Sequence, residues 1–346
     1  EGLGKMHAVL FVGGVTALQA YLNHKGIKLT SALTDMSGYL IFAVAVTLTL
    51  SLLIFSPVAL DFSRLTTFTN YTGVEGSTWP DLSGAGMAFL LGLLLTTYTI
   101  TGFDASAHTS EETKNAPVNV PKGILRAVFW SALFGYLMVA TFVLTMSSVD
   151  DGVKQGFGFL SELMKSLPPF LNVLLSVGIF VANFLCGLAC LTSTSRMMYA
   201  FARDGGLPAS NALKAVSPKY STPVAAIWVS AIAVFAATLY GDAYLVLATG
   251  SAVLLYISYV SPIAAGLLAE GKTWTHKGPF NLGGASKLVA VLAIIGGVIL
   301  AFVGTQPPNE KVLYLVVGLA VVLLIFWFAG VRSTFKGPPM VSKDMK

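Results

Sequence analysis

The chain has 346 residues, of which 55% are hydrophobic and only 11% are charged, and its mean hydropathy is +0.76. Soluble domains carry roughly 25% charged residues, so this composition excludes an ordinary water-soluble protein. The net charge of +5 would suit a nucleic-acid-binding protein, but the charges follow a membrane topology described below, and we expect no nucleic-acid partner. We therefore predict an all-α integral membrane protein whose surface contacts a lipid bilayer.

Apolar segments recur along the whole chain. Each is about long enough to cross roughly 30 Å of hydrocarbon as a helix. We identify nine: 7–22, 37–56, 86–112, 123–147, 169–200, 222–240, 245–269, 286–304 and 312–331. The first is the shortest. The intervening loops resemble neither a linker nor an independent domain, so we expect residues 1–346 to form a single transmembrane domain.

The third segment contains Asp104, which we assign as the one carboxylate inside a membrane-length segment. Placing such a group at bilayer depth costs roughly 2.5–3.5 kcal/mol on insertion scales, and it normally marks a ligand or ion pathway. Asp104 follows Gly102, and five hydroxyl-bearing residues precede it: Thr96, Thr97, Tyr98, Thr99 and Thr101. The uncharged stretch around Asp104 is also longer than one crossing requires. We predict that the helix is unwound from Tyr98 to Ala105.

A structural explanation of the same residues is available. Gly102 could be a packing glycine, the threonines could bond carbonyls of their own helix, and Asp104 could pair with a neighbouring segment. Each of these is common when it occurs alone. The coincidence of a glycine, an acid, a hydroxyl cluster and an over-long segment favours the functional interpretation.

The basic residues are distributed unevenly between the two sides of the predicted membrane domain. Sixteen of the 21 Lys and Arg residues fall in one set of alternate loops and the carboxyl-terminal tail, and five fall in the other set. By the positive-inside rule the carboxyl terminus is cytoplasmic and Glu1 is outside. Because the chain also begins without Met or a signal segment, we expect a fragment that lacks preceding helices. The predicted location is a plasma membrane or a bacterial inner membrane.

The stretch from Tyr98 to Ala116, YTITGFDASAHTSEETKNA, closely resembles the amino acid–polyamine–organocation superfamily. The nearest resemblance is to its amino acid/choline transporter branch, and the runs 120–124 (VPKGI) and 202–208 (ARDGGLP) fit the same pattern. The resemblance covers nearly the whole chain. It implies the five-plus-five inverted-repeat transporter fold, with family helices four to twelve present, the sixth broken, and helices one to three absent. It also implies secondary active transport of amino acids or related amines.

The resemblance implies roles for particular residues. Tyr98 would be an aromatic gate over the substrate, the backbone near Thr101 and Gly102 would meet its amine or carboxylate, and Phe103 would pack its side chain. Asp104 would bind a cationic group or take part in proton coupling. The predicted substrate-binding residues are Tyr98, Thr101, Gly102, Phe103, Asp104, Ala105 and Asn183. For Asn183, a hydrogen bond between helices is an equal alternative. Since the absent first helix supplies half of the family site, we expect the present chain alone not to transport.

The coupling ion is inferred from the hydroxyl and lysine side chains that relatives of this fold carry in two of the segments. Sodium-coupled relatives of this fold place two hydroxyls where this chain has Ala189 and Cys190, although hydroxyl side chains lie close by at Thr192, Ser193 and Thr194. Some proton-coupled relatives carry a lysine in the segment corresponding to 37–56, which has none here. We favour proton coupling or exchange over sodium symport.

Other functions fit the sequence less well. A permease for choline, ethanolamine or polyamines would suit Asp104, whereas a channel or receptor would be expected to show polar rings or a seven-helix core. An enzyme would need converging ionisable groups near the membrane interface. Transport driven by ATP is unsupported, because no phosphate-binding glycine loop is apparent in the sequence. Cys186 and Cys190 lie one turn apart without a further Cys or His nearby in sequence, so we expect no metal and no cofactor.

Overall fold

The protein is described by a computed structural model that covers residues 2–74, 81, 84–239, 243–275, 277–307 and 309–335. Within these ranges the regular elements are helices, and the only β-type pairing is an isolated bridge between Glu270 and Trp274. The prediction of an all-α protein is therefore confirmed. Part of the predicted basic tail, residues 336–346, lies outside the described residues.

The longer helices correspond to the predicted segments. They are α1 (Gly2–His24), α2 (Ile27–Ile54), α3 (Ala85–Ile100), α5 (Ala116–Thr145), α8 (Pro169–Arg203), α10 (Val224–Thr238), α11 (Ala243–Ala269), α12 (Ser286–Val303) and α13 (Glu310–Phe326). Short helices connect or extend them: α4 (Ala105–His108), α6 (Val149–Gln155), α7 (Phe159–Met164), α9 (Ser210–Leu213) and α14 (Arg332–Thr334). A π-helical turn, Trp327–Val331, joins α13 to α14.

In the described part of the chain, seven helical stretches are long and apolar enough to cross a membrane. The other two predicted segments also form helices, but α1 is not among the seven and α10 has only 15 residues. The length of α1 is sufficient at 23 residues, but polar side chains such as Gln19 and Asn23 lower its hydropathy. The second helix begins at Ile27, ten residues before the predicted 37, so that Asp35 lies within it.

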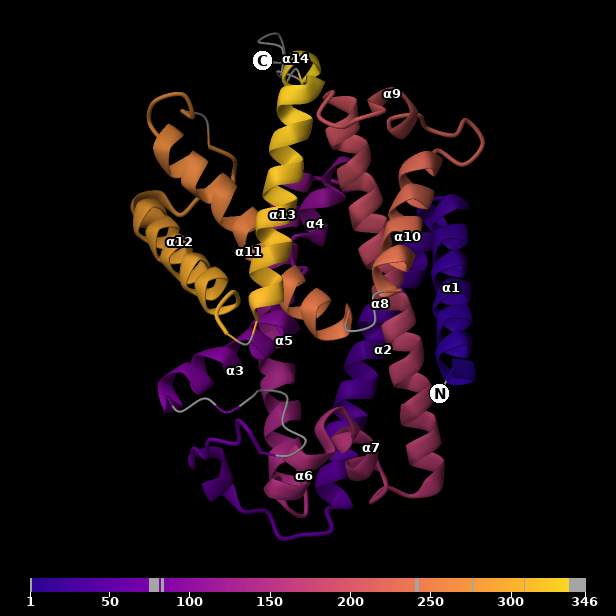
Figure 1. The fold of residues 1–346 in the computed structure, drawn as a ribbon, viewed down its shortest axis with the longest axis vertical. Helices are drawn as coiled ribbons and strands as arrows, with labels where there is room; N and C mark the ends of the chain where they lie inside the picture. Colours follow the sequence, from indigo (N-terminus) through magenta and orange to yellow (C-terminus); the bar gives the residue numbers. More distant parts are fainter. Residues whose placement is uncertain are drawn as a thin grey trace.

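The long helices run between two ends of the molecule (Figure 1). One end holds α9 and α14, and the opposite end holds α6 and α7. Helix α8 packs against α1, α2, α4 and α10, whereas α11 packs against α3, α12 and α13. Helices α3 and α4 therefore connect two groups of helices, and the break between them lies where α3, which packs against α11, is followed by α4, which packs against α8.

Helix α1 is attached to α8 by side-chain hydrogen bonds to backbone and side-chain groups. The Gln19 amide donates to Phe184 O at 2.8 Å, the Asn23 amide donates to Leu188 O at 3.3 Å, and the Thr192 hydroxyl donates to Asn23 Oδ1 at 2.7 Å. Such bonds between helices contribute to association within a bilayer, where burial of apolar surface drives it only weakly. The polar residues that shorten the apolar stretch of α1 are therefore the ones that bind it to α8.

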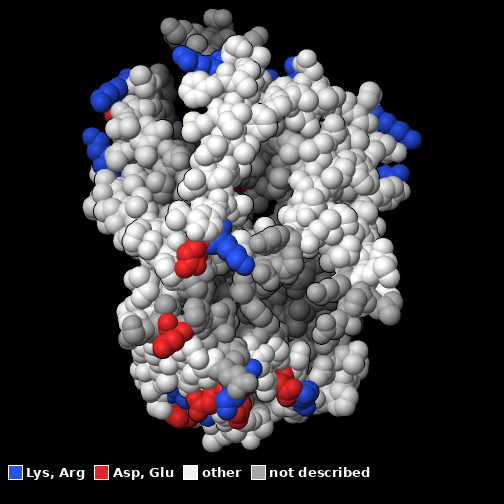
Figure 2. Space-filling model, in the orientation of Figure 1, with Lys and Arg blue, Asp and Glu red and all other residues white. Residues whose placement is uncertain are grey.

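Charged side chains concentrate at the two ends of the molecule (Figure 2). The end that holds α9 and α14 carries mainly Lys and Arg in this view, whereas the other end carries Asp and Glu together with Lys and Arg, and a few charged side chains lie between the two ends. Large apolar side chains are exposed along the helices between them, among them Phe170 at 75%, Ile232 at 65% and Leu288 at 64% exposure. A contiguous apolar surface of this kind is stable in lipid and not in water.

Candidate functional site

The membrane-length stretch Ala85–His108 is broken in its last third. Helix α3 ends at Ile100 and α4 begins at Ala105, and between them Thr101 is extended (ψ 163°) and Gly102 has φ +86°. A Cβ at Gly102 would meet nothing within 4 Å, so glycine is required there by the backbone conformation and not by space. The predicted break is confirmed, but it is shorter than predicted, because Tyr98 remains in α3 and Ala105 already belongs to α4.

The Asp104 carboxylate is held by two side chains. Its Oδ2 lies 2.9 Å from His108 Nε2, one turn further along the chain, and its Oδ1 accepts a hydrogen bond of 2.7 Å from the Tyr259 hydroxyl of α11. The Asp104 side chain is 18% exposed and that of His108 is 29% exposed. These three groups form a continuous hydrogen-bonded chain from α11 through the break to α4.

Tyr259 is the residue that sequence reasoning missed. Besides bonding to Asp104, its hydroxyl accepts a hydrogen bond of 3.4 Å from Gly102 N, and its ring lies 4.7 Å from the Phe103 ring at an interplanar angle of 36°. Tyr259 therefore contacts three of the four residues of the break. A tyrosine inside an apolar segment needs a partner for its hydroxyl, which is the signal that could have indicated it, but nothing in the sequence indicates which segment provides that partner.

The other predicted residues lie in different surroundings. Tyr98 is 44% exposed in the last turn of α3, and its carbonyl accepts a hydrogen bond of 2.7 Å from the Thr101 hydroxyl. The Ala105 amide donates to Gly102 O at 3.1 Å and begins α4. Asn183 is on an exposed part of α8, where its amide donates to Ile179 O of the same helix at 2.9 Å. Its recorded hydrogen bond thus belongs neither to the break nor to another helix.

The ionisable side chains at the break are the Asp104 carboxylate, the His108 imidazole and the Tyr259 hydroxyl. Among the described residues there is no group of three or more His, Cys, Asp or Glu that could hold a metal ion. Cys186 and Cys190 are free and exposed on α8. The Thr192 hydroxyl, near the position where sodium-coupled relatives carry hydroxyls, donates to Asn23 Oδ1 and to Leu188 O. A carboxylate bonded to a tyrosine and a histidine can accept a proton or pair with an amine.

Comparison with known proteins identifies the family. A family model described as amino acid permease matches residues 3–329. The amino-acid permease BAT1 of Arabidopsis thaliana is 30% identical over 94% of this chain and 66% of its own length. The BAT1 homolog of Oryza sativa is 32% identical over 72% of this chain and 52% of its own length. Amino-acid permease 2 of Neurospora crassa is 28% identical over 96% of this chain and 62% of its own length.

The match to the family model and the similarity to these relatives extend over most of the present chain. In each of the three relatives the aligned region covers between about half and two thirds of the relative's length. The family agrees with the motif from Tyr98 to Ala116 and with the broken helix that this motif encodes. The chain belongs to the amino acid permease family, within the amino acid–polyamine–organocation superfamily.

Proposed function

We propose that the protein to which this chain belongs is a secondary active transporter of amino acids or related amines, coupled to protons or working by exchange. The observation that carries the proposal is the helix break at Thr101–Asp104, where the Asp104 carboxylate lies directly before α4. Backbone groups released from a helix inside a membrane need partners, because lipid supplies none. Many secondary transporters use such discontinuous helices near the midplane to hold the substrate.

The proposed substrate-binding residues are those predicted from the sequence: Tyr98, Thr101, Gly102, Phe103, Asp104, Ala105 and Asn183. The break places the first six along one short length of chain, and the exposure of Tyr98 suits contact with a solute. Asn183 has weaker support, because its recorded bond is to its own helix. We propose that the protein lies in a plasma membrane or a bacterial inner membrane, with the end that holds α9 and α14 on the cytoplasmic side.

Asp104 is proposed to couple transport to proton movement. In the described state its carboxylate is bonded to the Tyr259 hydroxyl and lies beside His108. A proton added to the carboxylate would turn an acceptor into a donor and rearrange both bonds. Because Tyr259 also binds Gly102 N, that rearrangement would reach the backbone of the break.

The test is uptake by the full-length protein in proteoliposomes, with external sodium replaced by N-methylglucamine at two external pH values. We expect the substitution Asp104→Asn to abolish accumulation against a gradient while membrane insertion is unchanged. Asp35→Asn is the matched control, because Asp35 is an exposed carboxylate in α2. Normal accumulation by the Asp104→Asn variant, or a strict sodium requirement in the wild type, would contradict the proposed coupling.

A permease for choline, ethanolamine or polyamines is the second candidate. The observation in its favour is Asp104, which suits a cationic group and repels a substrate carboxylate placed beside it. Thermal-shift measurements on the full-length protein with amino acids, choline, ethanolamine and polyamines separate the two candidates. Stabilisation by zwitterionic amino acids and not by choline would support the first.

A further inference from the structure

Two lysines from distant parts of the chain converge on one tyrosine. Lys25 directly follows α1, and Lys219 lies in the segment before α10; the end of α1 and the start of α10 both lie toward the end that holds α9 (Figure 1). The Lys25 ammonium is 5.3 Å from the centroid of the Tyr220 ring, and the Lys219 ammonium is 5.2 Å from the same centroid. Two like charges beside one ring repel each other, so an anion beside them would stabilise the arrangement.

The two ammonium groups are not paired with an acid of the protein. Among the described residues neither Lys25 nor Lys219 forms an ion pair, whereas Lys277 is paired with Glu270. Hydrogen bonds from Lys219 and Lys25, in that order, lower the pKa of the Tyr220 phenol. An ammonium group has three donors, so each lysine keeps donors for a further partner.

Hydrogen bonds hold the two lysine-bearing segments together. The Thr222 hydroxyl donates to His24 O at 3.1 Å, and the Trp228 indole donates to His24 Nδ1 at 3.2 Å. The His24 ring also packs edge-on against the Tyr220 ring, with centroids 5.1 Å apart and an interplanar angle of 82°. The backbones that carry the two lysines are therefore fixed beside the tyrosine by the fold.

An exposed apolar face of α1 leads to this pair of lysines. Phe11, Leu18 and Tyr21 are all exposed, and their spacing of seven and then three residues places them on one face of the helix. Lys25 follows Tyr21 by one turn, its amide donates to Tyr21 O at 3.1 Å, and its ammonium lies 4.9 Å from the centroid of the Tyr21 ring. A molecule lying along this face would meet apolar side chains, then aromatic rings, and then positive charge.

That order of side chains is complementary to an anionic phospholipid. Its acyl chains lie against apolar side chains, aromatic rings lie at the level of its headgroup, and its phosphate is an anion that lysine binds as a point charge. The cytoplasmic leaflet carries anionic lipids that attract lysines next to the membrane. A dissolved phosphate ion would meet the same lysines but would gain nothing from the apolar face.

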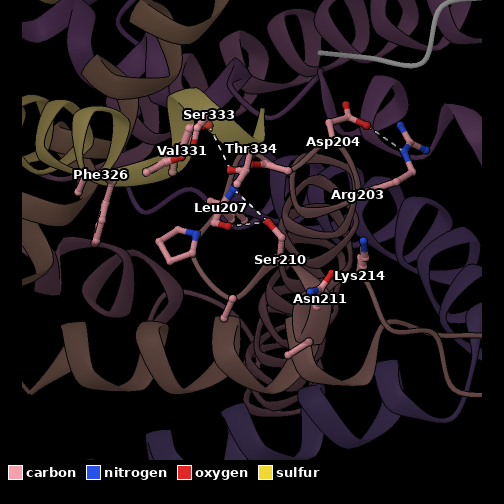
Figure 3. A pocket seen from close by; sticks show the side chains of 16 residues that line it. Arg203, Asp204, Leu207, Ser210, Asn211, Lys214, Phe326, Val331, Ser333 and Thr334 are labelled. Carbon is pink, nitrogen blue, oxygen red and sulfur yellow. Dashed lines mark hydrogen bonds and ion pairs between the residues drawn. The ribbon is translucent and has the colours of Figure 1, made fainter. Parts of the chain in front are cut away.

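A larger cavity at the same end lacks such a pair of cations. It has a volume of about 830 Å³ and lies between the loop after α8 and the end of the last helix (Figure 3). The basic residues in its lining are Arg203, which is paired with Glu111 and Asp204, and Lys214. Lys214 is thus a lysine at this end of the molecule with no second unpaired cation among the residues that line its cavity.

We propose that Lys25, Lys219 and Tyr220 form a binding site for the phosphate of an anionic phospholipid in the cytoplasmic leaflet. The two ammonium groups pair with the phosphate oxygens, and an acyl chain lies along the exposed face of α1. A bound lipid joins the end of α1 to the segment before α10 and so stabilises the folded protein. The site lies on other elements than the helix break, and its occupation does not depend on the proposed transport function.

The test measures the melting temperature of the purified full-length protein in detergent with dihexanoyl phosphatidylglycerol, dihexanoyl phosphatidylcholine or sodium phosphate. We expect the anionic lipid to raise the melting temperature, because a ligand of the folded state stabilises it. The lipid concentration needed for a given rise should increase about fivefold in Lys25→Gln and in Lys219→Gln, and about twentyfold in the double variant. Replacing both lysines by arginine keeps the charges and should keep the response.

Lys214→Gln is the matched control, because it removes the same charge at the same end of the molecule and should respond to the lipid as the wild type does. An equal weakening in this control, an undiminished response in the folded Lys25→Gln and Lys219→Gln variants, or equal stabilisation by phosphatidylcholine would overturn the site. A rise with sodium phosphate as large as the rise with phosphatidylglycerol would overturn the lipid as its ligand.

Discussion

Asp104 shows how one buried acid is accommodated inside a membrane protein. Its two oxygens face partners from different elements, Tyr259 of α11 at 2.7 Å and His108 of α4 at 2.9 Å. Bonds to a charged group contribute about 1.5–3 kcal/mol each, which is comparable to the roughly 2.5–3.5 kcal/mol cost of inserting the acid. The carboxylate is therefore stable in the protein interior while it keeps both partners, and it becomes sensitive to whichever of them is removed.

The Tyr259 hydroxyl should matter for coupling more than its ring does. The substitution Tyr259→Phe removes the bonds to Asp104 and Gly102 N and keeps the contact with the Phe103 ring. We expect proton-driven uptake by the full-length protein to fall by about tenfold, as for loss of one bond to a charged group. The measurement is the initial uptake rate at equal expression. Tyr256→Phe is the control on the same helix, and an equal loss in both variants would contradict a specific role for Tyr259.

Gly102 is needed for its backbone conformation. At φ +86° an L residue is strained, and nothing within 4 Å of the added Cβ adds a steric cost. Gly102→Ala should therefore destabilise the protein by about 1–2 kcal/mol. The control is Gly92→Ala in α3, a helical position with equally open space, where alanine should raise stability by about 0.5–1 kcal/mol. Melting temperatures in detergent decide this, and a shift in the same direction for both variants would refute the assignment.

At the scale of elements, the sequence predicts the existence of the break better than its limits. Gly102 and the residues around it indicate a break within 98–105, but the helix persists through Ile100, where the Thr101 hydroxyl caps the carbonyl of Tyr98. The partner of Asp104 could not be predicted, because Tyr259 is 155 residues away in the chain. Hydropathy indicates which segments enter the membrane and does not indicate which of them become neighbours.

The bonds between α1 and α8 give a prediction at the same scale. Asn23 is fully buried, donates to Leu188 O and accepts from the Thr192 hydroxyl. Asn23→Ala should destabilise the protein by about 1 kcal/mol, because hydrogen bonds between membrane helices contribute about 0.6 kcal/mol on average and up to about 1.7 kcal/mol, and Asn23 makes two of them. Asn183→Ala is the matched control, because that exposed amide bonds only to Ile179 O of its own helix in the described structure. Equal losses of melting temperature would show that the interhelical bonds contribute nothing specific.

For the whole molecule, composition and charge pattern predict the class of protein and the helical architecture, and seven of the nine predicted segments are confirmed as long apolar helices. The two exceptions have a physical cause. Helix α10 is only 15 residues long, and α1 uses buried polar residues for its contact with α8, so hydropathy alone underestimates α1. The ionic contact between Glu112 and Arg196 was not predicted, because the two residues are 84 positions apart in the sequence.

The orientation of the whole molecule follows from its charged ends and can be measured directly. In a background with both free cysteines, Cys186 and Cys190, replaced by alanine, a single cysteine is introduced as Ser63→Cys near the end with α6, or as Asn211→Cys in α9. Both positions are exposed. Because the end with α9 carries mainly Lys and Arg, the positive-inside rule places it in the cytoplasm. A membrane-impermeant maleimide should label the Ser63→Cys variant of the full-length protein in intact cells and the Asn211→Cys variant only after permeabilisation. The reverse pattern would place the basic end outside and would contradict the proposed orientation.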